Sequence, residues 1–292
     1  MKSVRELAAL RRSVRDARAH VSSVGLVPTM GALHEGHLSL VRLARKECGF
    51  TVVSIFVNPM QFAPGEDFER YPRREADDTT ILDTAGVDLV YLPDAKELYP
   101  PDFSTAIEVA GVSAGAEGAA RPGHFRGVAT VVAKLFLQVQ PDAAFFGRKD
   151  LQQVAVIRRM TRDLDFPVRI VVGPTVREPD GLALSSRNAY LSAQERRQAS
   201  AFPAALFTAR RRAADGERDV GRLESETRRD LETAGLGVDY VEVVRPDTMA
   251  RPTRIEPGAA LCAAVRAGKT RLIDNVVLID AETAASEDSR KS

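Results

Sequence analysis

The chain has 292 residues, of which 44% are hydrophobic and 28% are charged. These proportions are ordinary for a globular protein and exclude a mainly disordered chain, a collagen or a disulfide scaffold. Lys and Arg number 41 against 40 Asp and Glu, so the net charge of +1 disfavours a general nucleic-acid binder. The length predicts about two domains.

Cysteine usage and hydropathy predict a soluble, cytoplasmic protein. Cys48 and Cys262 are far apart in the sequence, so neither a zinc site nor a disulfide framework is expected. The N-terminal segment, residues 1–20, carries charges every few positions, and we expect no signal peptide. The longest uncharged run, residues 48–65, contains two prolines, an Asn and a Gln, so we expect no membrane span.

Helical and strand patterns alternate in the first part of the chain. The predicted helices are residues 3–20, 37–46, 75–84, 126–139 and 151–164, and the predicted strands are residues 24–27, 51–57, 88–92, 104–109, 143–146 and 168–172. Ser3 and Glu6 have the spacing of a capping box, and Pro28 is expected to end the first strand. This α/β alternation favours a parallel sheet with right-handed crossovers, so residues 1–175 are predicted to form a Rossmann-like domain.

The composition changes after about residue 174. The predicted elements there are helices at residues 192–214 and 220–234 and strands at residues 238–244, 259–265 and 270–279. Residues 176–292 are therefore predicted to form a smaller α+β C-terminal domain. Residues 110–120 are rich in Ala and Gly and predict a flexible loop, and the polar residues 281–292 are expected to fray.

The first candidate site is PTMGALHEGH, residues 28–37, between a predicted strand and the next helix. Ligands of open α/β sheets bind outside the carboxyl ends of strands, and a helix N-terminus offers N–H groups to phosphate. His34 and His37 would point the same way and stabilise a leaving pyrophosphate. Two surface histidines at a helix cap are the alternative, which this strand–turn–helix context disfavours. Zinc is disfavoured because no third His or Cys is near and the spacing is not H-E-x-x-H.

Three further segments carry candidate binding residues. Asn58 and Gln61 follow a predicted strand and suit a ligand with a carboxylate and hydroxyls, although a turn Asn before proline is an equal alternative. In FGRKDLQQ, residues 146–153, Lys149 can contact phosphate. Asp150 and Gln153 also have the spacing of a helix cap, which is the structural alternative for Asp150. In REPDGLALSSR, residues 177–187, two hydroxyls and a guanidinium can hold a triphosphate, whereas a polar linker is the alternative.

Read in order, PTMGALHEGH, FVNPMQF, RPGHFRGV, FGRKDLQQ and REPDGLALSSRN resemble the pantothenate synthetase (pantoate–β-alanine ligase) family of H-x-G-H nucleotidyltransferases. The resemblance implies a Rossmann-like domain, a smaller C-terminal lid and a homodimer. It also implies a two-step reaction. Pantoate attacks the α-phosphorus of ATP to give pantoyl adenylate and pyrophosphate, and β-alanine then displaces AMP to give pantothenate. Mg²⁺ accompanies the ATP.

The resemblance also assigns residues. The expected ATP contacts are Met30, Gly31, Ala32, Leu33, His34, Glu35, Gly36, His37, Gly147, Arg148, Lys149, Asp150, Val176, Leu184, Ser185, Ser186 and Arg187. The expected catalytic residues are His37, His34, Lys149, Ser185, Ser186 and Arg187. Gln61 and Gln153 are expected to hold pantoate, with Asn58 nearby. The magnesium ligands are not assigned.

Two rival functions stay open at this point. One is another nucleotidyltransferase of the same fold with a different small acceptor, which would need basic residues at the acceptor pocket. The other is a nucleotide-binding regulator without turnover, which would not need to keep both histidines and Lys149.

Overall fold

The structure is a computed structural model that describes residues 1–280. The chain divides into two compact units. Unit 1 comprises Met1–Ala110, Arg121–Arg148 and Val156–Val176, and unit 2 comprises Gly111–Ala120, Lys149–Ala155 and the described residues from Arg177 to Asp280. The predicted boundary between two functional domains at residues 175 and 176 stays a prediction.

Unit 1 contains a parallel sheet with the strand order β1-β4-β3-β2-β5-β6. Its strands are β1 (Lys2–Val4), β2 (Val24–Thr29), β3 (Phe50–Ile55), β4 (Leu89–Tyr91), β5 (Ala143–Gly147) and β6 (Arg169–Gly173). Strands β3 and β4 lie on one side of β2 in the sheet, and the later strands β5 and β6 lie on its other side. The topology therefore reverses between β2 and β5, which is where ligands bind in open α/β sheets. The predicted Rossmann-like fold is confirmed.

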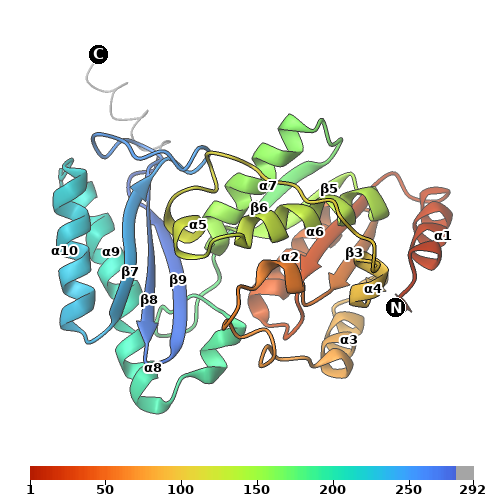
Figure 1. The fold of residues 1–292 in the computed structure, drawn as a ribbon, viewed down its shortest axis with the longest axis horizontal. Coiled ribbons are helices and arrows are strands. Elements are labelled where there is room, and N and C mark those ends of the chain that lie inside the picture. Colours follow the sequence, from red (N-terminus) through yellow and green to blue (C-terminus); the bar gives the residue numbers. More distant parts are fainter. Residues whose placement is uncertain (281–292) are drawn as a thin grey trace. The chain divides into compact units, whose positions relative to one another are not determined.

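Helices flank this sheet (Figure 1). The helices of unit 1 are α1 (Leu7–Arg18), α2 (Glu35–Glu47), η1 (Pro59–Gln61), α3 (Glu75–Thr84), α4 (Ala95–Leu98) and α6 (His124–Val139). Residues 149–155 of η2 (Arg148–Asp150) and α7 (Leu151–Asp163) belong to unit 2, and the rest of α7 belongs to unit 1. The buried side chains Val41 and Ala44 of α2 and Leu82 of α3 form one core with Val27 and Val53 of the sheet. This packing gives the loops at the carboxyl ends of β2 and β3 a rigid support.

Unit 2 contains an antiparallel sheet with the order β7-β8-β9. Its elements are α5 (Ala116–Ala120), η3 (Ser186–Tyr190), α8 (Ala193–Ala199), α9 (Ala201–Ala214), α10 (Val220–Thr233), β7 (Gly237–Val244), β8 (Ala260–Ala267) and β9 (Thr270–Val277). Helices α9 and α10 pack against this sheet (Figure 1). Phe202, Leu206 and Leu223 of these helices are buried with Leu261 and Val265 of β8. The predicted smaller α+β fold is confirmed.

The predicted helix over residues 3–20 is wrong at its start. Residues 2–4 form β1, which pairs with β4, and the helix begins at Leu7. The Glu6 side chain makes no capping bond; the backbone N–H of Leu7 instead donates to Glu97, a residue far away in the sequence. Long-range pairing therefore overrides the local capping signal.

Two strand predictions are also corrected. Strand β2 continues through Pro28 to Thr29, and proline is tolerated there because pairing with β5 ends at Leu26. Residues 104–109 form no strand. The backbone N–H of Ile107 donates to the hydroxyl of Thr130 on α6, at 2.9 Å, rather than to a neighbouring strand.

In unit 2, the predicted helix at residues 192–214 is two helices, because Pro203 has no N–H to donate to the carbonyl of Ala199. The expected loop at residues 110–120 contains α5. The expectation for residues 281–292 lies outside the described residues. The remaining predicted elements differ from the observed ones by at most two residues at either end. Within residues 1–280, no helix has the length and apolar character that crossing a membrane requires.

Candidate functional site

The turn after β2 is held by a buried carboxylate. Asp78 of α3 is 2% exposed, and its two oxygens accept hydrogen bonds from the backbone N–H groups of Ala32 and Leu33, both at 2.8 Å. Gly31 and Ala32 adopt positive φ angles of +80° and +49°. A Cβ at Gly31 would lie 2.9 Å from Asp78, so glycine is required there. Helix α3 thereby fixes the turn that leads into the H-x-G-H motif.

The two histidines of this motif cap the N-terminus of α2. Nδ1 of His34 accepts from the backbone N–H of Gly36 at 3.2 Å, and Nδ1 of His37 accepts from the backbone N–H of His34 at 3.3 Å. Their ring centroids are 4.1 Å apart. A backbone N–H can only donate, so neither Nδ1 carries a proton, and the proton of each neutral ring is on Nε2. The structure therefore shows both histidines as helix caps, and their contact with phosphate through Nε2 stays a prediction.

Asn58 and Gln61 belong to a buried polar network after β3. Asn58 is 1% exposed, and its Nδ2 donates to Oε1 of Gln61 at 3.0 Å and to the carbonyl of Gly127 at 3.1 Å. Its Oδ1 accepts from the N–H of Met60 at 3.2 Å and from the hydroxyl of Tyr99 at 2.9 Å. These four bonds use the hydrogen-bonding capacity of Asn58, which therefore reaches a ligand only through Gln61.

The backbone of Gln61 is fixed by the RPGHFRG segment. Nδ1 of His124 donates to the carbonyl oxygen of Gln61 at 2.8 Å, and Arg121 donates to the same oxygen at 3.2 Å. Arg121 also forms an ion pair with Glu66 at 2.6 Å. Burial raises the pKa of Glu66, but the hydrogen bonds and charge of Arg121 outweigh it and hold the pKa below its ordinary value. Arg126 is exposed. The segment thus supports Gln61.

The FGRKDLQQ segment places its two glutamines differently. Gln152 is 5% exposed and accepts from the N–H of Glu117 while donating to the carbonyls of Val112 and Gly115, all at 2.9 Å. It therefore links the segment before α5, and the start of α5, to α7. Gln153, the residue assigned to pantoate, is only partly buried.

Lys149 and Asp150 lie in η2, just before α7. Nζ of Lys149 is 3.6 Å from Oδ1 of Asp150. The carbonyl of Lys149 accepts from Nδ2 of Asn275 at 2.8 Å, so β9 fixes the backbone that carries the lysine.

A buried ion pair supports the segment with the two serines. Arg177 donates to both carboxylate oxygens of Asp274, at 2.6 and 3.1 Å, and to the carbonyl of Gly181 at 3.0 Å. Burial raises the pKa of Asp274, and Arg177 opposes that rise. Oγ of Ser185 accepts from the N–H of Arg187 at 3.3 Å and caps η3. The segment is therefore a folded loop held by β9 rather than a plain linker.

The predicted site residues are distributed over both units. Unit 1 holds residues 30–37, Asn58, Gln61, Gly147, Arg148 and Val176, and unit 2 holds Lys149, Asp150, Gln153 and residues 184–187. Sequence reasoning missed Asp78 as a support of the turn, and it missed Tyr99. Gly127 lies within the RPGHFRGV motif, but its role was not predicted: a Cβ there would lie 2.2 Å from the carbonyl oxygen of Met60.

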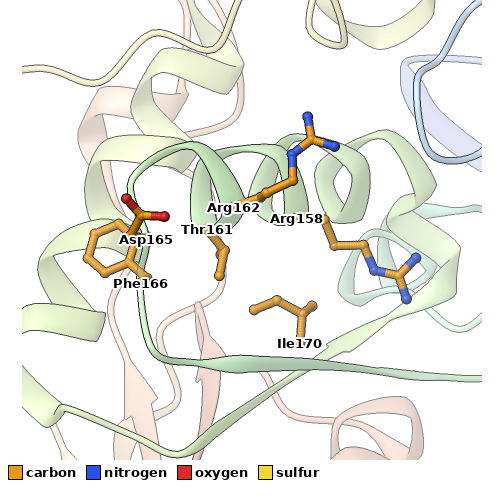
Figure 2. A pocket seen from close by; sticks show the side chains of 6 residues that line it. All are labelled: Arg158, Thr161, Arg162, Asp165, Phe166 and Ile170. Carbon is orange, nitrogen blue, oxygen red and sulfur yellow. The ribbon is translucent and has the colours of Figure 1, made fainter.

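A separate surface hollow of about 580 Å³ lies along α7 and β6 (Figure 2). Its lining residues are Arg158, Thr161, Arg162, Asp165, Phe166 and Ile170. None of them belongs to the predicted site.

An open parallel sheet that reverses at β2 and β5, with an H-x-G-H turn leading from β2 into a helix N-terminus, defines the class as an α/β nucleotide-binding protein of the H-x-G-H type. A family profile described as pantoate–beta-alanine ligase matches residues 2–277. The chain belongs to the pantoate–β-alanine ligase family, which confirms the resemblance seen in the motifs.

Curated relatives and solved structures agree with this assignment. Pantothenate synthetase 1 of Bradyrhizobium diazoefficiens is 51% identical over 279 residues, covering 95% of this chain and 98% of the relative. Pantothenate synthetase of Sphingopyxis alaskensis is 54% identical over 94% of this chain and 99% of the relative. The crystal structure of pantothenate synthetase from Thermus thermophilus is 48% identical, with a TM-score of 0.89 over 96% of this chain and all of that chain.

A pantoate–beta-alanine ligase from Francisella tularensis, solved in complex with beta-gamma ATP and beta-alanine, is 31% identical. Its TM-score is 0.77 over 95% of this chain and 98% of that chain. The rival function with a different acceptor is not favoured by any of these relatives.

Proposed function

We propose that the chain condenses pantoate with β-alanine in an ATP-dependent ligation that passes through pantoyl adenylate. A carboxylate oxygen of pantoate attacks the α-phosphorus, and the bond to pyrophosphate breaks. The amine of β-alanine then attacks the acyl carbon, loses a proton and displaces AMP. The observation that carries this proposal is the capped H-x-G-H turn at the reversal point of the sheet, in a chain of this family.

Unit 1 supplies the groups that we assign to the leaving pyrophosphate. His34 and His37 have their protons on Nε2, so each presents an N–H donor to phosphate oxygens. Charge grows on these oxygens as the bond to the α-phosphorus breaks, and preoriented donors stabilise that charge most strongly in the transition state. Pyrophosphate is already a good leaving group, so we assign charge stabilisation rather than proton donation as the main role of His37.

The remaining binding roles follow from the motifs. We assign Gln61 and Gln153 to pantoate, and Asn58 to the support of Gln61. We assign Lys149, Ser185, Ser186 and Arg187 to the phosphates of ATP, because cationic and hydroxyl donors form strong hydrogen bonds to phosphate. Gly147, Arg148, Asp150, Val176 and Leu184 are assigned to the nucleotide, together with residues 30–36.

Magnesium belongs to this proposal as part of the MgATP substrate. Among residues 1–280, no group of three or more His, Cys, Asp or Glu side chains is arranged to hold a metal ion, and both oxygens of Asp78 accept backbone N–H groups. Phosphate oxygens and water are ordinary Mg²⁺ ligands in such sites. We also propose a cytoplasmic location, in line with the free Cys48 and Cys262. A homodimer is proposed from the resemblance to the family alone.

The test is the exchange of labelled pyrophosphate into ATP, measured with magnesium before β-alanine is added. Exchange that requires pantoate supports adenylate formation. Other small hydroxy acids and phosphorylated alcohols are the matched controls for the acceptor. Exchange that proceeds with one of these and not with pantoate would overturn the proposal.

A further inference from the structure

Three side chains of unit 1 form a hydrogen-bonded chain that ends at Gln61, one of the residues assigned to pantoate. Tyr99 follows α4 directly, and its hydroxyl lies 2.9 Å from Oδ1 of Asn58. Nδ2 of Asn58 lies 3.0 Å from Oε1 of Gln61. Nothing in the motifs identifies Tyr99 as part of a substrate site.

Backbone groups determine which end of each amide faces which neighbour. The N–H of Met60 can only donate, so the Asn58 atom 3.2 Å from it is the oxygen. The carbonyl of Gly127 can only accept, so the Asn58 atom 3.1 Å from it is the nitrogen. That nitrogen also faces Gln61, whose nearest atom must therefore be Oε1. The other end of the Gln61 amide, Nε2, then lies on the opposite side, 3.0 Å from Sδ of Met30.

Tyr99 is the donor in its bond to Asn58, because Oδ1 of an amide carries no proton. Burial raises the pKa of the Tyr99 hydroxyl, which therefore keeps its proton. Its ring packs against Phe103 and Phe56, with centroid distances of 5.1 and 6.0 Å. The hydroxyl is thus a firmly held second donor to Oδ1, and it restrains the plane of the Asn58 amide.

We propose that Tyr99 is a positioning residue for pantoate, which acts through Asn58 to hold Gln61 with its N–H groups, rather than its carbonyl, toward the substrate. An N–H donor recognises an acceptor oxygen, and the carboxylate and hydroxyl oxygens of pantoate are such acceptors. The inference rests on the proposed function, in which Gln61 binds pantoate.

The matched pair of variants is Tyr99→Phe and Tyr91→Phe. Tyr91 is fully buried in the same unit, and within residues 1–280 its hydroxyl has no hydrogen-bond partner, so it controls for the loss of a buried hydroxyl. Tyr99→Phe should raise the KM for pantoate roughly three- to tenfold, the equivalent of one lost hydrogen bond, while the KM for ATP stays within about twofold of the wild type. Tyr91→Phe should leave the KM for pantoate unchanged.

A double-mutant cycle with Gln61→Ala tests whether Tyr99 acts through Gln61. At low pantoate concentration, Tyr99→Phe should reduce kcat/KM in the wild-type background and cause no further loss in the Gln61→Ala background. The inference is overturned if Tyr99→Phe leaves the KM for pantoate unchanged, or if its effect is equally large without Gln61. A wild-type chain without pantoate-dependent pyrophosphate exchange would instead overturn the proposed function, and the inference with it.

Discussion

The backbone N–H of His34 donates a hydrogen bond to Nδ1 of His37 at 3.3 Å, in the first turn of α2. The bond closes the helix N-terminus and leaves the proton of His37 on Nε2. Helix capping uses Nδ1 of His37, and the proposed contact with phosphate would use Nε2 of the same ring, so the turn that starts the helix would also orient the proposed donor.

Replacing His37 with Ala should reduce pantoate-dependent pyrophosphate exchange by roughly 100- to 1,000-fold, the effect of losing one preoriented donor. Far-ultraviolet circular dichroism should stay unchanged. The control is His20→Ala, which removes an exposed histidine of the same unit. Exchange by His37→Ala within a few-fold of the control would rule out the assigned role.

Asp78→Asn should impair the same half-reaction without touching a substrate. An amide has one acceptor oxygen, so one of the two N–H groups, of Ala32 or Leu33, loses its partner and the turn is held less firmly. We expect exchange to fall by roughly tenfold. Asp83→Asn, on the exposed side of the same helix, should change exchange less than twofold. Equal rates for the two variants would contradict the proposed support of the turn.

Arg177→Met should destabilise unit 2. The substitution leaves the carboxylate of Asp274, whose side chain is 1% exposed, without its ion-pair partner. Breaking a buried pair on one side costs about 3 kcal/mol in the free energy of unfolding, which urea titration measures. Arg266→Met removes the exposed partner of Asp239 and should cost less than about 1 kcal/mol. A similar urea midpoint for both variants would show that the Arg177–Asp274 pair stabilises the fold no more than the exposed Arg266–Asp239 pair does.

Much of the fold, and the turns that make up the candidate site, could be predicted from local patterns. The alternation of apolar periods identifies the helices and strands of the parallel sheet, and Gly, Pro, His and Asn at strand ends identify the turns that carry polar groups. These signals extend over a few residues, so a single sequence contains them directly. Both the Rossmann-like sheet and the H-x-G-H turn are of this kind.

The features that were missed depend on contacts between distant residues. Glu97 caps the helix at Leu7 over 90 residues, Asp78 binds the N–H of Ala32 over 46 residues, and Tyr99 binds Asn58 over 41 residues. No local spacing relates these partners, since only the folded sheet brings α3 and α4 to the loops after β2 and β3. The same reason explains why residues 2–4 form a strand in spite of their capping signal.

The Glu66–Arg121 pair predicts a pH dependence of stability. Arg121 holds the pKa of Glu66 below its ordinary value of 4.5, so the pair stabilises the folded state above that pH and loses this contribution as the pH falls through the lowered pKa. Glu66→Gln should therefore lower the free energy of unfolding by on the order of 1 kcal/mol at pH 7. The difference from the wild type should shrink as the pH falls below 4.5 and through the lowered pKa of Glu66. If the difference in the free energy of unfolding between Glu66→Gln and the wild type grows toward acid pH, the pair does not stabilise the folded state in the way proposed.

The most direct test of the adenylate route follows the carboxylate oxygens of pantoate. Pantoate labelled with oxygen-18 in its carboxylate, incubated with MgATP and β-alanine, should transfer one labelled oxygen to AMP, because that oxygen bridges the acyl group and the α-phosphorus before β-alanine attacks. Mass spectrometry of the AMP measures the transfer. Label found in inorganic phosphate, or in neither product, would contradict the pantoyl adenylate and the mechanism built on it.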